Sequence, residues 1–331
     1  MGADRPTVTL CLLNFNGAKF VDRCLAAVRA LDPAPTEIVV VDNASGDGSA
    51  ATLAAFAAEG GPVPVRFVPA GSNRGYAGGH NLGARHARGD LLAFLNITCA
   101  PDVHWLDVVP WIADHPDVAF VQPAIFHADD PDRLESLGTL LDPWGGLRVL
   151  GRDRRARPGA TGTYVGEALA VLGAAFVARR AVFEALGGFD EQMFMYFEET
   201  DLCWRGWLAR HRTVGWYVAG RGTGVRHAFH GTHPPGFDPA RFFEPNRTLT
   251  LVRNLEGRHL WHVGRNVATV VAESARRPGR IVRYLATVVD RLPAAAAARR
   301  RIQATRVVPD SRLFGLRPPP ALDALFVAPP A

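Results

Sequence analysis

The chain has 331 residues, of which 48% are hydrophobic and 21% are charged, and this balance excludes a disordered or fibrous protein. Its formal net charge is +5, but after Ser274 eleven arginines stand against three aspartates, so the basic charge belongs to the last part of the chain. Four widely separated cysteines form no Cys-x-x-Cys pair, which excludes a disulfide framework and a zinc knuckle and indicates a reducing cytosol.

The sequence offers no targeting or spanning segment. Its first residues run into a strand-like stretch without an apolar signal core, and the longest apolar run, Ala168 to Ala178, is too short to cross a bilayer. We therefore expect a cytoplasmic protein that is not secreted by this route.

Short apolar runs alternate with helix-compatible segments through the first part of the chain. The predicted strands are 8–13, 37–41, 66–68, 91–96 and 118–121, and the predicted helices between them are 19–30, 49–58 and 76–87. This alternation predicts an α/β domain with a parallel-type sheet covered on both faces and ligands at the carboxyl ends of its strands.

The later part of the chain is less regular. Residues 140–166 are rich in Gly, Pro and Arg and predict a hairpin or a mobile loop. An apolar strand over 169–178 follows, with helices near 180–186 and 199–210. Beyond Glu244 the pattern is helical, with a break at 276–280.

Two polar segments follow predicted strands. Asp42 ends a buried strand before a glycine turn, where a carboxylate is able to accept a hydrogen bond from a nucleobase or a ribose hydroxyl. The alternative is that Asp42 only forms an Asx turn. In 73–81, three glycines and Arg74 stand at a helix start that suits a phosphate, and tight packing or capping is the alternative.

Acidic and histidine clusters follow later. Glu198, Glu199 and Asp201 stand where an aromatic segment meets a helix, which suits a partly desolvated general base, or alternatively a capped helix start. His227, His230 and His233 recur every third residue, a spacing that is compatible with a divalent metal.

Taken together and in this order, these segments resemble the GT-A glycosyltransferases of family 2, especially their bacterial rhamnosyltransferase-like branch. The resemblance covers about residues 7–255. The matching segments are Asn14-Phe15-Asn16-Gly17, residues 41–48, residues 73–81, Gly173-Ala174-Ala175, residues 187–191, residues 194–202 and residues 246–254.

The resemblance implies a mixed GT-A sheet flanked by helices and an inverting transfer from a UDP-, dTDP- or GDP-sugar to an acceptor hydroxyl. Glu199 stands where the family places its base, with Glu198 as second choice. The implied donor-binding residues are Asn14, Asn16, Asp42, Asn73, Arg74, Gly75, Gly79, Asn81 and Asn96. The implied residues on the acceptor or phosphate side are Asp201, Arg205 and Gly173.

The sequence departs from the family pattern after the fourth predicted strand. Such enzymes typically carry an acidic metal-binding motif there, whereas this chain reads Leu95-Asn96-Ile97-Thr98. A hydroxyl is a weaker ligand than a carboxylate for Mg²⁺ or Mn²⁺. Three alternatives follow. Thr98, His227 or His230 holds the metal together with the diphosphate, arginine side chains take the place of the metal, or the protein has lost its activity.

We divide the chain into a glycosyltransferase domain, 1–255, and a helical, Arg-rich appendage, 256–331. The segment Trp261 to Val289 mixes apolar residues with arginines at helical spacing. It predicts either peripheral attachment to the inner face of the plasma membrane, which suits a lipid-linked acceptor, or helices packed on the domain.

Three other functions compete with an active transferase. A non-catalytic nucleotide-sugar-binding or scaffold protein agrees with Thr98. A nicotinamide-dependent oxidoreductase is disfavoured because no Gly-x-Gly-x-x-Gly follows the first strand. Nucleic-acid binding lacks a recognised module. The acceptor is either a lipid-linked glycan or a small metabolite. A homodimer is a further possibility.

Overall fold

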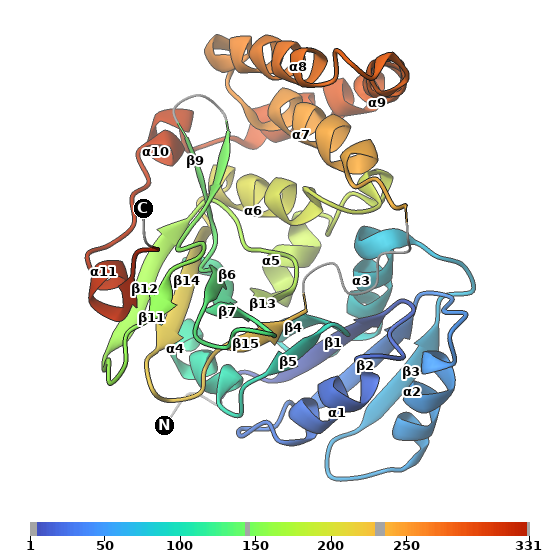
Figure 1. Cartoon of the computed structure of the whole chain (residues 1–331), viewed down its shortest axis with the longest axis vertical. Helices are drawn as coiled ribbons and strands as arrows, with labels where there is room; N and C mark the ends of the chain where they lie inside the picture. Colours follow the sequence, from blue (N-terminus) through green and yellow to red (C-terminus); the bar gives the residue numbers. More distant parts are fainter. Residues whose placement is uncertain (1–4, 143–145, 229–235, 330–331) are drawn as a thin grey trace.

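The computed structural model describes residues 5–142, 146–228 and 236–329. An eight-stranded sheet in the order β12-β14-β6-β13-β4-β1-β2-β3 forms its centre (Figure 1). The strands are β1 (Val8–Asn14), β2 (Glu37–Asp42), β3 (Val65–Pro69), β4 (Leu91–Asn96), β6 (Val118–Pro123), β12 (Thr163–Ala168), β13 (Ala175–Arg179) and β14 (Arg212–Val218).

The sheet is mixed, as the family resemblance implies, and not the parallel-type sheet that the alternation alone predicts. Strands β1 to β4 are parallel, but β13 runs antiparallel to both β4 and β6. The predicted strand over 169–178 is in fact a loop, 169–174, followed by β13. Because the Ala174 carbonyl accepts from the Asn96 N–H at the carboxyl end of β4, the strand that follows must run back along the sheet.

Helices cover both faces of the sheet. On one face lie α1 (Val21–Arg29), α2 (Ser49–Ala58) and α4 (Val108–Asp114), and on the other α3 (Gly75–His86), α5 (Arg180–Ala185) and α6 (Glu198–Leu208) (Figure 1). Alternate residues of each strand point to opposite faces. Leu10 and Leu12 therefore pack in the core with α1, and Cys11 packs in the core with α3.

A smaller four-stranded sheet, in the order β5-β15-β7-β8, lies beside the end of β4. It consists of β5 (Cys99–Pro101), β15 (Val225–His227), β7 (Ile125–His127) and β8 (Leu134–Ser136). The hairpin predicted within 140–166 is present as β9 (Thr139–Leu141) and β10 (Leu147–Val149), followed by β11 (Arg155–Ala156). Pairing of His227 with Cys99 brings the end of β15 next to Thr98.

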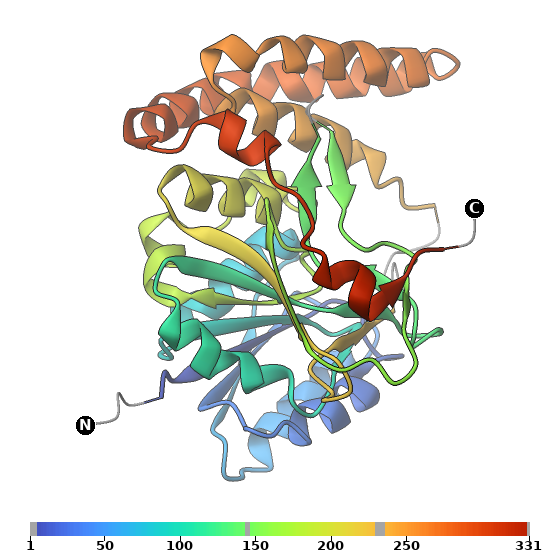
Figure 2. The ribbon, with the colours of Figure 1, turned by 90° about the vertical axis from the view of Figure 1, so that its left-hand side faces the viewer.

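The C-terminal part is helical, as predicted, and consists of α7 (Ala240–Asn254), α8 (Trp261–Glu273), α9 (Pro278–Thr305), α10 (Asp310–Phe314), α11 (Ala321–Leu325) and a short β16 (Phe326–Val327). Figure 2 shows α8 and α9 lying across one end of the molecule. The predicted boundary after residue 255 falls between α7 and α9, which pack on each other, and β16 pairs with β11.

Even α9, with 28 residues, lacks the apolar character that a bilayer-crossing helix needs, and so does every other helix in the described ranges.

Candidate active site

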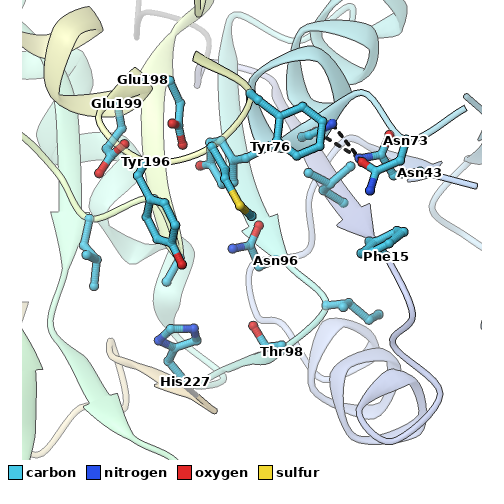
Figure 3. A pocket seen from close by; sticks show the side chains of 18 of the residues that line it. Phe15, Asn43, Asn73, Tyr76, Asn96, Thr98, Tyr196, Glu198, Glu199 and His227 are labelled. Atoms are coloured by element: carbon cyan, nitrogen blue, oxygen red, sulfur yellow. Dashed lines mark hydrogen bonds between the residues drawn. The ribbon is translucent and has the colours of Figure 1, made fainter. Parts of the chain in front are cut away.

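A cavity of about 360 Å³ opens at the carboxyl ends of β1, β2 and β4 (Figure 3). Its lining residues come from strand ends, from the start of α3, from the loop before β13 and from the start of α6. They are Leu13, Phe15, Asn43, Asn73, Gly75, Tyr76, Asn96, Ile97, Thr98, Leu172, Gly173, Ala174, Phe194, Met195, Tyr196, Glu198, Glu199, His227 and Phe237. Such a position at strand carboxyl ends is where α/β sheets bind ligands.

Asn43 organises one wall of this cavity. Its side-chain amide donates to the Gly75 carbonyl at 2.9 Å and to Asn73 Oδ1 at 3.0 Å, and its Oδ1 accepts from the Arg74 N–H at 2.9 Å. These bonds hold the turn before α3 against the end of β2. The Gly75 N–H donates to Asn73 Oδ1 at 2.9 Å and the Ala77 N–H to the Phe194 carbonyl at 3.2 Å, so these groups already have acceptors. What the start of α3 offers an anionic group is the positive end of its dipole.

Asp42 and Asn14 lie directly beneath this wall. Asn14 Nδ2 donates to Asp42 Oδ1 at 2.8 Å and to Ser49 Oγ at 2.8 Å, and Asp42 is only 4% exposed. Because the two residues are register partners at the ends of β1 and β2, their side chains meet across the strands. They do not line the cavity, so the structure gives them a supporting position behind Phe15 and Asn43.

Gly75 requires glycine for two reasons. Its φ of 67° lies in the left-handed region, and a Cβ added there would lie 2.2 Å from the Phe194 carbonyl oxygen. This close approach joins the start of α3 to the aromatic segment before α6. The turn before α3 and the segment that leads into α6 therefore meet at one point.

Glu198 and Glu199 form the opposite wall at the start of α6. Burial, reinforced by the neighbouring Glu199, raises the pKa of Glu198 well above its ordinary value, and burial also raises the pKa of Glu199 to about 7. A hydrogen bond from the Glu198 carboxyl to Glu199 opposes part of that second shift. One Oε atom of each residue has no hydrogen-bond partner in the described part of the chain. This pair is suited to accepting a proton near neutral pH.

The backbone that leads into α6 is strained. Phe194, Tyr196 and Phe197 have φ angles of 62°, 67° and 72°, values that residues with a Cβ rarely adopt. Asn246 in α7 compensates: its Nδ2 donates to the carbonyls of Met193, Met195 and Tyr196 at 2.8 to 2.9 Å. A buried amide from a distant helix therefore sets the position of the two glutamates.

Thr98 and His227 lie on the side of the cavity away from the glutamates, and Asn96 lies between the two sides (Figure 3). His80, whose pKa burial lowers to about 3, contacts Asn96 Oδ1 through Nε2 at 3.3 Å. His227 Nδ1 lies 2.9 Å from Oε2 of Glu135, a buried carboxylate of β8. A carboxylate that orients a histidine in this way is typical of metal ligands. Glu198 and Glu199 are the cavity's only lining carboxylates among the described residues.

Several residues predicted for the site lie outside the cavity lining. Asp201, which is 1% exposed, faces α7: it pairs with Arg205 at 2.8 Å and accepts from Asn254 Nδ2 at 2.9 Å. Asp201 belongs to the first turn of α6, as Glu198 and Glu199 do, but these contacts with α7 and Arg205 occupy its carboxylate. Arg205 is further tied to the Gly188 carbonyl at 2.8 Å, and neither residue lines the cavity.

The remaining residues outside the lining have local structural contacts. Asn81 binds the Phe189 backbone, and a Cβ at Gly79 would lie 2.5 Å from Leu13. Asn16 accepts from the Gly46 N–H, and the Arg74 side chain donates to the Ala70 carbonyl. His230 lies outside the described residues. Asn73, Gly75, Asn96, Thr98, Gly173, Glu198, Glu199 and His227 do line the cavity.

Five residues of the site and its surroundings were not among the site residues predicted from the sequence: Phe15, Asn43, Tyr76, Tyr196 and Glu135. The signal for Phe15 and Asn43 was available, because each directly follows a strand-end residue that was selected. Glu135 gave no signal, because only the pairing of β7 with β8 and β15 brings it to His227.

Comparison with known proteins decides the family. A family model described as "Glycosyl transferase family 2" matches residues 9–187, more than half of the chain. The chain belongs to glycosyl transferase family 2.

Two relatives of this family-2 chain are named for the reactions that they catalyse. The N-acetylglucosaminyl-diphospho-decaprenol L-rhamnosyltransferase of Mycobacterium tuberculosis is 28% identical over 271 residues, which are 72% of this chain and 81% of that protein. The low-salt glycan biosynthesis hexosyltransferase Agl10 of Haloferax volcanii is 28% identical over 177 residues, 51% of this chain and 52% of that protein. The chain thus spans about half the length of the Haloferax relative.

Solved structures confirm the GT-A fold for this family-2 chain. GalNAc-T7 with UDP, GalNAc and Mn²⁺ superposes with a TM-score of 0.63 at 15% identity, covering 88% of this chain and 58% of that one. Residues 1–349 of S. aureus TarS in complex with UDP-GlcNAc superpose with a TM-score of 0.54 at 14% identity. The match covers 91% of this chain and 84% of that one. At these identities the likeness shows the fold alone.

Proposed function

We propose that this chain is an inverting glycosyltransferase that moves a sugar from a UDP-, dTDP- or GDP-sugar to an acceptor hydroxyl. The observation that carries the proposal is one cavity in which a donor-side turn, Asn73 to Tyr76, faces the buried carboxyl pair of Glu198 and Glu199. Phe15 and Asn43 would receive the nucleoside. The positive end of the α3 dipole would face the diphosphate.

The reaction is a single displacement. The acceptor oxygen forms a bond to the anomeric carbon while the bond from that carbon to the diphosphate oxygen breaks, so the nucleoside diphosphate leaves with the electron pair. Glu199 takes the acceptor proton, and its pKa of about 7 suits that role near neutral pH. Glu198, which holds its proton more firmly, donates to Glu199 and keeps it oriented.

A divalent cation, Mg²⁺ or Mn²⁺, fits the edge of the cavity at His227. The Glu135 carboxylate orients this imidazole, and Thr98 offers a neutral oxygen nearby. The donor's diphosphate would supply the negatively charged ligands that Thr98 does not. When bound, the cation offsets charge on the departing diphosphate.

We also propose that the protein works at the inner face of the plasma membrane, to which it attaches peripherally. The basic C-terminal helices support this location.

The proposed activity is tested by incubating the chain with a panel of nucleotide sugars, with and without Mn²⁺, and measuring both donor binding and release of nucleoside diphosphate. Turnover that is lost in Glu199→Gln while donor binding persists supports the transferase. Binding without turnover in the unmodified chain would instead identify a nucleotide-sugar-binding protein, and no binding of any donor would contradict both.

A further inference from the structure

The helices α8 and α9 expose apolar side chains to solvent. On α9, Val282 and Val289 are 66% and 68% exposed, and Leu285 and Leu292 are 39% and 42% exposed. Their spacing of three, four and three residues places all four on one side of the helix. On α8, Trp261 is 52% exposed. These side chains would normally be buried, so a stripe of them indicates an interaction surface.

Exposed arginines accompany this stripe along the chain. Arg276 and Arg277 lie in the turn before α9, and Arg283 lies next to Val282; all three are exposed, and none forms an ion pair within the described ranges. From Trp261 to Thr305, Glu273 and Asp290 are the only acidic residues. We call these three arginines, Trp261 and the four apolar residues of α9 the α8–α9 face.

We propose that the α8–α9 face docks on a bilayer that contains anionic lipid. Apolar side chains of a surface helix enter the boundary between headgroups and acyl chains, and a tryptophan is favoured at that depth. Arginines beside them bind lipid phosphates.

This face is joined to the cavity by direct contacts. Tyr284 of α9 hydrogen-bonds Thr248 of α7 at 2.8 Å, and Arg280 pairs with Glu244. Arg291 donates to Asn246 Oδ1 at 3.5 Å, and Asn246 holds the Tyr196 carbonyl at 2.9 Å. Docking would therefore fix the orientation of the acidic wall relative to the lipid. We extend this inference to an acceptor carried by a lipid, and that part rests on the proposed function.

The test is flotation of the full chain with phosphatidylcholine vesicles, with and without phosphatidylglycerol. We expect flotation only with phosphatidylglycerol and a decrease at high salt. Arg276→Glu/Arg277→Glu/Arg283→Glu should weaken partitioning by at least about hundredfold, since one arginine contributes about fivefold. Val282→Asp/Val289→Asp should also abolish flotation. Both valines are mostly exposed, so the folded chain loses little packing.

Matched controls lie at the other end of the molecule. Arg23→Glu/Arg66→Glu/Arg88→Glu changes the charge by the same amount, and Val103→Asp changes a valine that is 43% exposed; both should float like the unmodified chain. The proposal is overturned if the unmodified chain does not float or if controls and α8–α9 variants behave alike. It is also overturned if sedimentation shows a dimer that Val282→Asp/Val289→Asp dissociates. Donor binding measured without vesicles separates any failure of the proposed function from failure of docking.

Discussion

Asn43 and Gly75 are joined by a hydrogen bond of 2.9 Å from the Asn43 side-chain amide to the Gly75 carbonyl. Through this bond the end of β2 holds the turn at which α3 begins, 32 residues later in the chain. The cavity wall that would receive a nucleotide is therefore built by one side chain rather than by the turn alone.

We expect Asn43→Ala to weaken nucleotide binding by about tenfold and to lower the free energy of unfolding by about 1–3 kcal/mol, because buried partners lose their hydrogen bonds. Calorimetric titration with UDP, dTDP and GDP and thermal unfolding would measure the two effects. Asn16→Ala is the control, because Asn16 also binds a loop N–H but lies outside the cavity. Equal losses in both variants would argue against a special role for Asn43.

Glu199→Gln should lower kcat by about 10² to 10⁴ and leave donor affinity nearly unchanged, because only proton removal is lost. In the unmodified chain the base is active when deprotonated. With a Glu199 pKa of about 7, kcat should rise with pH through 7 and level off above it. Steady-state rates from pH 5.5 to 9 would check this. A rate that is flat across this range is incompatible with Glu199 as the base.

Glu198→Gln should stabilise the fold increasingly as pH rises. Because the pKa of Glu198 is raised in the folded state, the folded chain keeps this proton at pH values above 4.5, the ordinary pKa of the side chain, where the unfolded chain releases it. The unmodified chain therefore loses stability as pH rises from there, whereas glutamine has nothing to release. We expect the Tm difference to grow to about 2 °C or more at pH 8. A difference that does not change between pH 5 and pH 8 would contradict the raised pKa.

Glu135→Gln should reduce Mn²⁺ affinity by about 10- to 100-fold without touching the cavity, because Glu135 orients His227. Paramagnetic resonance of free Mn²⁺ in the presence of chain and UDP would report this independently of turnover. His227→Ala should give a loss at least as large, and Thr98→Asp should increase affinity by supplying a carboxylate. Unchanged Mn²⁺ binding in both Glu135→Gln and His227→Ala would place the cation elsewhere.

Asp201→Asn should cost about 3–5 kcal/mol of folding free energy, because it leaves the cation of Arg205 without its buried carboxylate, whereas Arg253 keeps its pair with Asp190. Asp117→Asn, which breaks an exposed pair with Arg212, should cost at most about 1 kcal/mol. Chemical denaturation of both variants would measure the contrast. If donor binding were lost in Asp201→Asn while stability held, Asp201 would belong to the site after all.

The sequence allowed the strands and helices of the first half to be predicted because their apolar periods are local. It also placed Glu198 and Glu199 at a helix start. It could not show that Asp201 faces α7, because the spacing of three and four residues that groups Glu198, Asp201 and Arg205 does not say which of them meets the cavity. Nor could it find Glu135, whose meeting with His227 depends on strand pairing between residues 92 apart.

The direction of β13 is a further example. Residues 169–178 have the composition of one buried strand, but bonds from distant residues divide them into a loop and a reversed strand. Ala170 bridges Thr139, the Leu172 N–H donates to Gln122, and the Ala174 carbonyl accepts from Asn96. Gly173, which lines the cavity, owes its position to that loop.

The three hydrogen bonds from Asn246 to the segment before α6 also decide how the chain can be shortened. The part that matches the family model ends at residue 187, yet the carboxyl pair, His227 and α7 all come later in the chain. A recombinant fragment ending there would keep the nucleotide-facing turn and lack the base. One ending before α7 would contain Glu199 but lack Asn246, which holds the strained segment 194–197 that leads into α6. Fragments designed for screening should therefore extend at least through Asn254.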